Sequence, residues 1–288
     1  MSNYLGLLLK VHIHPLFWAV AGISVLTGHF WELLTLFLIV GFHELGHAAS
    51  ARYFGWKIKQ ILILPFGGMC EVDEHGNRPI REELIIVASG PLQHVWMGAA
   101  ILLLEAGSLV SPDFAALFHQ YNIMVLLFNL LPIWPLDGGR LVHLFLSVQK
   151  PYLKAYKVSL ASSFCILAAF HLAVVSIAPL HLNVWIVMLY LYASLWKEWK
   201  QIRYSFVRFL LERHYGKQDD FRELKPIEAS GDKFIHETME KFKRGCKHLI
   251  HVTGPSGPMG HLDENELLHA YFTEKQVHAC LKDIVYHD

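Results

Sequence analysis

A His-Glu-Leu-Gly-His pattern at residues 43–47 carries the strongest chemical signal in this 288-residue sequence. Four residues of an α-helix turn through about 400°, so His43 and His47 lie on one face, one turn apart. Their imidazoles can bind one metal ion, and Glu44 beside them can accept a proton from water on that metal. Gly46 keeps one approach to this site narrow. The pattern is typical of metal-dependent hydrolysis, although 19 histidines also allow it to arise by chance.

A third metal ligand is expected from a distant segment, because catalytic zinc sites usually have three protein ligands and one open position. Asp137 is the candidate. Pro132 and Pro135 precede it and cannot continue a regular helix, and such broken backbone is tolerated at membrane depth where it lines a cavity. Gly138 and Gly139 follow it and allow close backbone approach. The alternative is that Leu-Asp-Gly-Gly is an ordinary loop after an apolar segment.

The composition points to a membrane protein. Charged residues make up 17% of the chain, against about 25% in soluble proteins. Six apolar stretches of 14 to 23 residues are candidates for bilayer-spanning helices, which need roughly 20 residues. These stretches are residues 8–27, 31–53, 84–105, 114–131, 155–177 and 182–195. We therefore predict a polytopic α-helical membrane protein with about six transmembrane helices. An ionisable residue inside such a helix costs about 2.5–3.5 kcal/mol, which favours a functional role for residues 43–47.

The placement of Lys and Arg predicts the topology. Neither residue type occurs in 82–139 or 158–196. The basic residues fall in alternate connections, as expected for a multi-pass cell-membrane protein with both termini in the cytoplasm. The formal net charge is +0, so no basic excess suggests a nucleic-acid partner.

The remaining segments predict a small amount of β-structure and a polar tail. Residues 57–73 are rich in β-forming side chains around Pro65 and Gly67-Gly68, which indicates a β-hairpin. We divide the chain into a membrane domain at 1–200, an interfacial helix and linker at 201–223, and a small α/β cytoplasmic domain at 224–288. In the tail, we expect helices near 233–244 and 264–272 and a strand at 247–252.

Two motifs together resemble the site-2 proteases, a family of intramembrane zinc metalloproteases. They are His-Glu-x-x-His at 43–47 and Asn-x2-Pro-x4-Asp-Gly from Asn129 to Gly138. Pro65-Phe66-Gly67-Gly68 resembles the family's hairpin, and Ser89-Gly90-Pro91 resembles a step that opens its next span. The chain departs from the family at His94, where Asn is frequent, and this leaves the role of His94 open.

The resemblance implies one Zn²⁺ per chain and a peptide bond as the bond that is cleaved. It implies metal ligands at the positions that match His43, His47 and Asp137, and a general base at Glu44. Asn129 and Pro135 match positions that face the substrate in the family.

The resemblance is strongest to a sporulation member of the family. It implies an enzyme of the mother-cell membrane surrounding the forespore, which removes the pro-sequence of a membrane-associated sigma factor precursor. It also implies inhibitory membrane protein partners. The tail resembles a single cystathionine-β-synthase (CBS) motif, which implies a homodimer and the binding of ATP or another adenine nucleotide. A generic α/β appendage that contacts the substrate is the alternative for the tail.

A zinc transporter, or another metal-binding membrane protein with a regulatory tail, is the alternative function. Membrane histidines and Asp137 suit both functions. Glu44 distinguishes them, because hydrolysis needs a base and transport does not.

Overall fold

The computed structural model describes residues 7, 10–64, 67–72, 78–177, 182–216, 223–255 and 257–285. The chain forms two compact units. Unit 1 contains Met1–Glu74, Arg81–Leu141 and Ala169–Leu191, and unit 2 contains His75–Ile80, Val142–Ala168 and Tyr192–Asp288. The predicted division at residues 200 and 223 remains a prediction.

Long helices dominate the membrane part of the chain. They are α2 (Pro15–Leu26), α3 (Phe30–Tyr53), α4 (Ile80–Ala106), α5 (Pro112–Asn129), α6 (Asp137–Gln149), α7 (Tyr152–Ile177) and α8 (Leu182–Tyr215). Each of the six predicted spans overlaps one helix, and α6 is an additional one. Among the described residues, α3, α4 and α7 are long and apolar enough to cross a membrane.

The first predicted span begins too early. Residues Val11–Ile13 form strand β1, and α2 begins at Pro15; Leu8 and Leu9 lie outside the described residues. Pro15 suits the first turn of a helix because its missing N–H has no helical partner there. Val11 and Ile13 instead pair with Ile61 and Ile63 of a strand far along the chain, a contact that local hydropathy does not reveal.

The predicted hairpin is confirmed and belongs to a larger sheet. Strands β2 (Ile58–Leu64) and β3 (Gly67–Val72) are antiparallel, and β1 pairs with β2 in parallel. Pro65, Phe66 and Asp73 lie outside the described residues. Ile58, Ile61 and Cys70 of the hairpin are buried together with Ala48 and Ala51 of α3, so the sheet is fixed against the helix that carries the His-Glu-x-x-His pattern.

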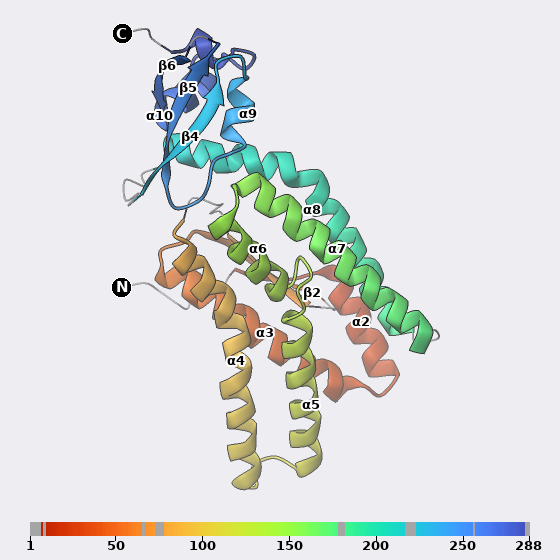
Figure 1. Ribbon diagram of the computed structural model, residues 1–288. Helices are drawn as coiled ribbons and strands as arrows, with labels where there is room; N and C mark the ends of the chain where they lie inside the picture. Colours follow the sequence, from red (N-terminus) through yellow and green to blue (C-terminus); the bar gives the residue numbers. More distant parts are fainter. Residues whose placement is uncertain are drawn as a thin grey trace. The chain divides into compact units, whose positions relative to one another are not determined.

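Helices α4 and α5 form an antiparallel pair beside α3 (Figure 1). Ser111 caps α5 by accepting a hydrogen bond from the Phe114 N–H, with Pro112 at the first helical position. A Cβ atom on Gly46 would lie 2.7 Å from the Ser89 carbonyl oxygen. Glycine at position 46 therefore lets α3 approach α4 closely.

The break between α5 and α6 contains Pro132 and Pro135, as predicted. Helix α5 ends at Asn129, and α6 begins at Asp137. A Cβ atom on Gly138 would lie 2.2 Å from the Leu130 carbonyl oxygen, and one on Gly139 would lie 2.5 Å from the Ile133 carbonyl carbon. The two glycines therefore let the first turn of α6 fold back against the loop that precedes it.

The tail is an α/β structure, as predicted, with more strands than expected. It contains β4 (Leu224–Ser230), α9 (Ile235–Met239), β5 (Lys247–Gly254), β6 (Gly257–Asp263) and α10 (Glu264–Phe272). Strand β4 is parallel to β5, β6 is antiparallel to β5, and α10 packs on β5 and β6 (Figure 1). The predicted helix at 233–244 is shorter, because the chain turns after Met239 and buries Phe242.

A buried ionic cluster joins the end of α8 to the tail within unit 2. The Arg213 guanidinium donates to both carboxylate oxygens of Glu264, and to the carbonyl oxygens of Lys243 and Cys246. The backbone N–H and Nδ1 of His248 lie 3.0 and 2.8 Å from Glu264 Oε2. Burial raises the pKa of the Glu264 carboxyl, but these partners outweigh it and hold the pKa below the ordinary value of 4.5.

We predict that this cluster makes the tail sensitive to acid. Glu264 has a lower pKa in the folded chain than in the unfolded chain, so its stabilisation is complete above about pH 4.5. The stabilisation is lost as the pH falls through the lower folded value. Labelling of the buried Cys246 thiol by dithiodipyridine, followed by mass spectrometry of its peptide, should therefore accelerate below pH 4.5.

Glu264→Gln provides the control for this prediction. It should destabilise the tail near neutral pH by about 3 kcal/mol, since it leaves Arg213 buried without its counter-charge. It should also flatten the acid dependence of Cys246 labelling. Equal pH profiles for the wild type and Glu264→Gln would contradict the assignment.

Candidate metal centre

The two histidines of the pattern meet on one face of α3. His43 and His47 are 2% and 4% exposed, and their Nε2 atoms lie 3.1 Å apart. The helix repeat produces this arrangement, because residues four apart are neighbours on the helix surface. His47 Nδ1 lies 2.7 Å from the carbonyl oxygen of Ile86 on α4, which orients the ring so that Nε2 faces the site.

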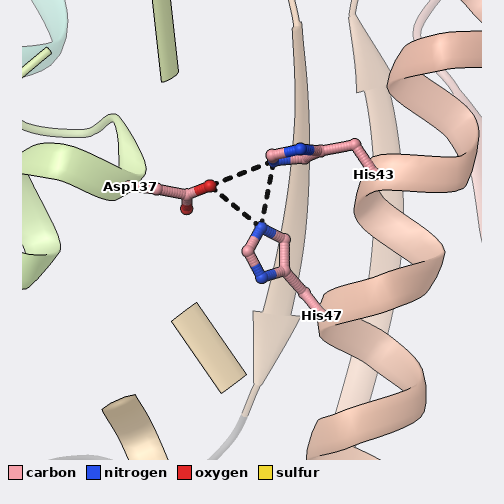
Figure 2. A group of neighbouring side chains, drawn as sticks. All are labelled: His43, His47 and Asp137. Atoms are coloured by element: carbon pink, nitrogen blue, oxygen red, sulfur yellow. Dashed lines mark hydrogen bonds and ion pairs between the residues drawn. The ribbon is translucent and has the colours of Figure 1, made fainter. Parts of the chain in front are cut away.

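Asp137 reaches the same point from the first turn of α6. Its Oδ2 atom lies 3.0 Å from His43 Nε2 and 3.2 Å from His47 Nε2. Figure 2 shows the three side chains pointing toward one another, two from α3 and one from α6. The structure therefore brings together the three residues that the sequence marked as candidate ligands, although Asp137 lies 90 positions after His47.

The donor set suits a divalent cation. Ligand atoms at about 2.0–2.1 Å from a tetrahedral zinc ion lie about 3.3 Å from one another, close to the three separations in this site. Asp137 Oδ2 is buried, yet it finds no hydrogen-bond donor of normal geometry among the described residues. Within those residues, His43, His47 and Asp137 are the group whose ligand atoms could hold a metal ion.

Glu44 lies beside the group formed by His43, His47 and Asp137, here called the metal group, and is 5% exposed. Strand β3 passes directly over it, because a Cβ atom on Gly68 would lie 2.3 Å from Glu44 Cγ. Cys70 follows on the same strand. Burial and the nearby Glu44 charge raise the pKa of the Cys70 thiol to about 12, so a thiolate at this position is disfavoured near neutral pH.

Gly90 shapes the site as Gly68 does, through contacts that the local sequence does not reveal. A Cβ atom on Gly90 would lie 2.2 Å from His47 Nε2 and 2.8 Å from His43 Cε1. Gly68 and Gly90 were identifiable only as parts of short motifs. Their roles depend on a strand and a helix that approach α3 from elsewhere in the chain.

The two candidate substrate-binding residues lie in and beside the break between the helices. The Asn129 amide donates to the Val125 carbonyl one turn earlier in α5, at 3.1 Å. Pro135 follows a cis peptide bond from Trp134. Their place before Asp137 is established, and their contact with substrate remains a prediction.

Comparison with known proteins identifies the family. Residues 31–111 and 105–170 match peptidase family M50. The chain is 44% identical over 285 residues to stage IV sporulation protein FB of Bacillus subtilis (strain 168), covering 99% of each chain. The chain belongs to peptidase family M50, the site-2 proteases.

Other relatives agree with this assignment. A zinc metalloprotease of Methanocaldococcus jannaschii is 32% identical over 167 residues, which span 55% of this chain and 48% of the relative. The solved site-2 protease from Methanocaldococcus jannaschii matches with a TM-score of 0.53 and 29% identity, over 65% of this chain and 89% of the other. The chain is thus an intramembrane zinc metalloprotease, and the family favours hydrolysis over the alternative of a zinc transporter.

We predict that two glycine substitutions disturb the site in different ways. Gly90→Ala would push a methyl group against His47 Nε2 and His43 Cε1, and should lower zinc affinity by about tenfold or more if these rings hold the metal. Gly68→Ala would displace Glu44 and leave those two rings untouched, so cleavage should fall while zinc is retained. Zinc content after dialysis and substrate cleavage measure the two effects.

Gly41→Ala is the matched control, because it lies on α3 two residues before His43 and an added Cβ atom there meets nothing within 4 Å. It should preserve both zinc content and cleavage. Retention of full zinc affinity by Gly90→Ala would contradict a role in metal binding for the two imidazoles that Gly90 approaches.

Proposed function

We propose that His43, His47 and Asp137 hold the catalytic zinc ion and that Glu44 is the general base for hydrolysis of a peptide bond. The observation that carries this proposal is the buried triangle formed by the two Nε2 atoms and Asp137 Oδ2, with sides of 3.0 to 3.2 Å. Three protein ligands leave one position open, as in catalytic zinc sites.

The chemistry divides between the metal and the side chain beside it. When bound by these three residues, zinc would supply a Lewis acid that lowers the pKa of a nearby water molecule toward neutrality. The Glu44 carboxylate accepts a proton from this water as the water attacks the scissile carbonyl carbon, and then delivers that proton to the departing amide nitrogen. The backbone of β3 at Gly68 lies against the Glu44 side chain in this position.

Asn129 and Pro135 are proposed to face the substrate. Both lie in or beside the break between α5 and α6, and this break leads directly to Asp137. A substrate segment that reaches the metal therefore passes close to this part of the backbone. The Asn129 amide could donate to the oxygen of the scissile carbonyl, in place of its present bond to Val125.

The proposed substrate is the pro-sequence of a membrane-associated sigma factor precursor. Support comes from the similarity to stage IV sporulation protein FB across 99% of both chains. The same similarity supports a location in the mother-cell membrane surrounding the forespore, and inhibition by membrane protein partners. It does not depend on the metal geometry, so the two parts of the proposal can be tested separately.

Six transmembrane segments with both termini in the cytoplasm remain our proposed topology. The alternation of Lys and Arg between connections supports it, and each predicted span overlaps a helix. We also propose domains at 1–200 and 224–288 with an interfacial helix and linker at 201–223. The strand, helix, two strands and helix of the tail support a single CBS-like motif. We therefore keep homodimerisation and adenine nucleotide binding as proposals.

The decisive experiment is substitution of Glu44 by Gln in the full chain. Co-expression with a candidate membrane-associated precursor should show cleavage reduced by about 10²- to 10⁴-fold, the contribution of a general base. The zinc content should stay at one ion per chain, because none of the three proposed ligands changes.

Glu32→Gln is the matched control, since it makes the same substitution in the first turn of the same helix. It should cleave at the wild-type rate. Cleavage by Glu44→Gln at the wild-type rate would refute the role of Glu44, whereas absence of zinc from the wild type would refute the ligand assignment.

A further inference from the structure

His94 and Asn122 lie directly behind the metal group without belonging to it. His94 is on α4 and Asn122 is on α5, and the two residues are 2% and 4% exposed. Both side chains are polar and sit where the helices pack together. A buried polar pair in this position needs complete hydrogen bonding, or it destabilises the helix packing.

A continuous chain of short polar contacts runs from these residues to the site. Asn122 Nδ2 donates to the His94 carbonyl oxygen at 2.9 Å. Asn122 Oδ1 lies 2.8 Å from His94 Nδ1, and His94 Nε2 lies 3.0 Å from His43 Nδ1. The remaining nitrogen of His43, Nε2, is the one that faces His47 and Asp137.

The protons in this chain can be assigned from its fixed end. A backbone carbonyl only accepts hydrogen bonds, so the Asn122 amide must turn its nitrogen toward the His94 carbonyl and its oxygen toward the His94 ring. An amide oxygen also only accepts, so His94 Nδ1 carries a proton. In a neutral imidazole the other nitrogen is then an acceptor, so His43 Nδ1 carries the proton between the two rings.

We propose that His94, oriented by Asn122, is a positioning residue that fixes His43 in the tautomer and ring orientation needed to bind the metal through Nε2. This inference rests on the ligand set proposed above. With its proton held at Nδ1, the His43 ring presents an unprotonated Nε2 to the site. Partners of this kind orient metal-binding histidines and increase the basicity of the ligand nitrogen.

The second histidine ligand is held by a comparable contact. His47 Nδ1 donates to the Ile86 carbonyl oxygen, which leaves its Nε2 unprotonated as well. Both rings therefore direct lone pairs at the same point as the Asp137 oxygen. The His43 ring is oriented by the His94 side chain, whereas the His47 ring is oriented by a backbone carbonyl. The orientation of His43 can therefore be tested by mutation of its partner.

The test measures zinc binding by the full-length chain in detergent, with zinc alone as the probe and a chelator series to set the free concentration. His94→Leu removes the acceptor for His43 Nδ1 and fills much of the same volume. It should lower zinc affinity by about 10- to 100-fold, the usual effect of losing such a partner. His94→Gln can place a carbonyl oxygen near the former Nε2 position, and should recover most of that loss.

Asn122 variants test whether Asn122 acts on His43 through His94 or only contributes to helix packing by itself. Asn122→Leu should weaken zinc binding in the same direction as His94→Leu. The double variant should be no weaker than His94→Leu alone, because residues that act through one chain are not additive. His119→Leu is the control, as it removes a histidine from the same α4–α5 contact, near Gly98, and should bind zinc like the wild type.

A spectroscopic measurement tests ligand geometry directly. Cobalt in place of zinc should give an altered visible absorption spectrum in His94→Leu, and a spectrum close to wild type in His94→Gln. Wild-type zinc affinity in a folded His94→Leu would overturn the inference, as would a His94→Gln that binds as weakly as His94→Leu. If His94→Leu does not fold, Asn122→Leu provides the test. Undiminished zinc binding by Asn122→Leu overturns the proposed series of hydrogen bonds.

These outcomes are distinguishable from failure of the proposed ligand set. A wild-type chain that binds no zinc refutes the ligands themselves. A wild-type chain that binds zinc, with His94 and Asn122 variants that bind it equally well, refutes only the positioning role.

Discussion

Three atoms that carry lone pairs meet in a buried space, and the rest of this structure depends on that arrangement. His43 Nε2, His47 Nε2 and Asp137 Oδ2 lie 3.0 to 3.2 Å from one another. Without a cation or a shared proton they would repel each other, and burial would add a cost of its own. A divalent metal ion removes both difficulties, because it replaces the repulsion with three attractive contacts. The apolar helices around the site can then pack as they would around an uncharged core.

Close backbone approach is what permits this geometry. Gly46 lets α4 pack against α3, and Gly90 places the α4 backbone against the edges of the two imidazoles. Gly68 brings β3 over Glu44, while Gly138 and Gly139 fold the start of α6 onto the preceding loop. Side chains at these positions would separate the segments that together form the site. The few polar residues of the site therefore require glycine at several neighbouring positions that carry no functional side chain themselves.

The sequence predicted the parts of the structure that local patterns determine. The spacing of His43 and His47 was enough to place both rings on one face of a helix, and the prolines after Asn129 were enough to end α5. Strand β1 was missed because Val11 and Ile13 pair with a strand about 50 residues away. Strand β4 of the tail was missed because it contains Pro226, and proline argues against a strand from the sequence alone. Pro226 is tolerated because β4 lies at an edge of its sheet, which also depends on distant pairing. The contact of His94 with His43 likewise depends on helix packing, which no local spacing encodes.

The two buried clusters of this chain combine similar residue types and differ in how their oxygens are used. In unit 2, both Glu264 oxygens accept hydrogen bonds from Arg213, and one also accepts from His248. Each oxygen of that carboxylate thus has a hydrogen-bond donor, so the cluster stabilises the tail. In unit 1, Asp137 Oδ2 lies near two imidazoles without accepting a hydrogen bond of normal geometry. Burial alone therefore does not distinguish a structural cluster from a metal-binding one. The distinguishing feature is the Asp137 oxygen, which keeps a lone pair that a ligand can use.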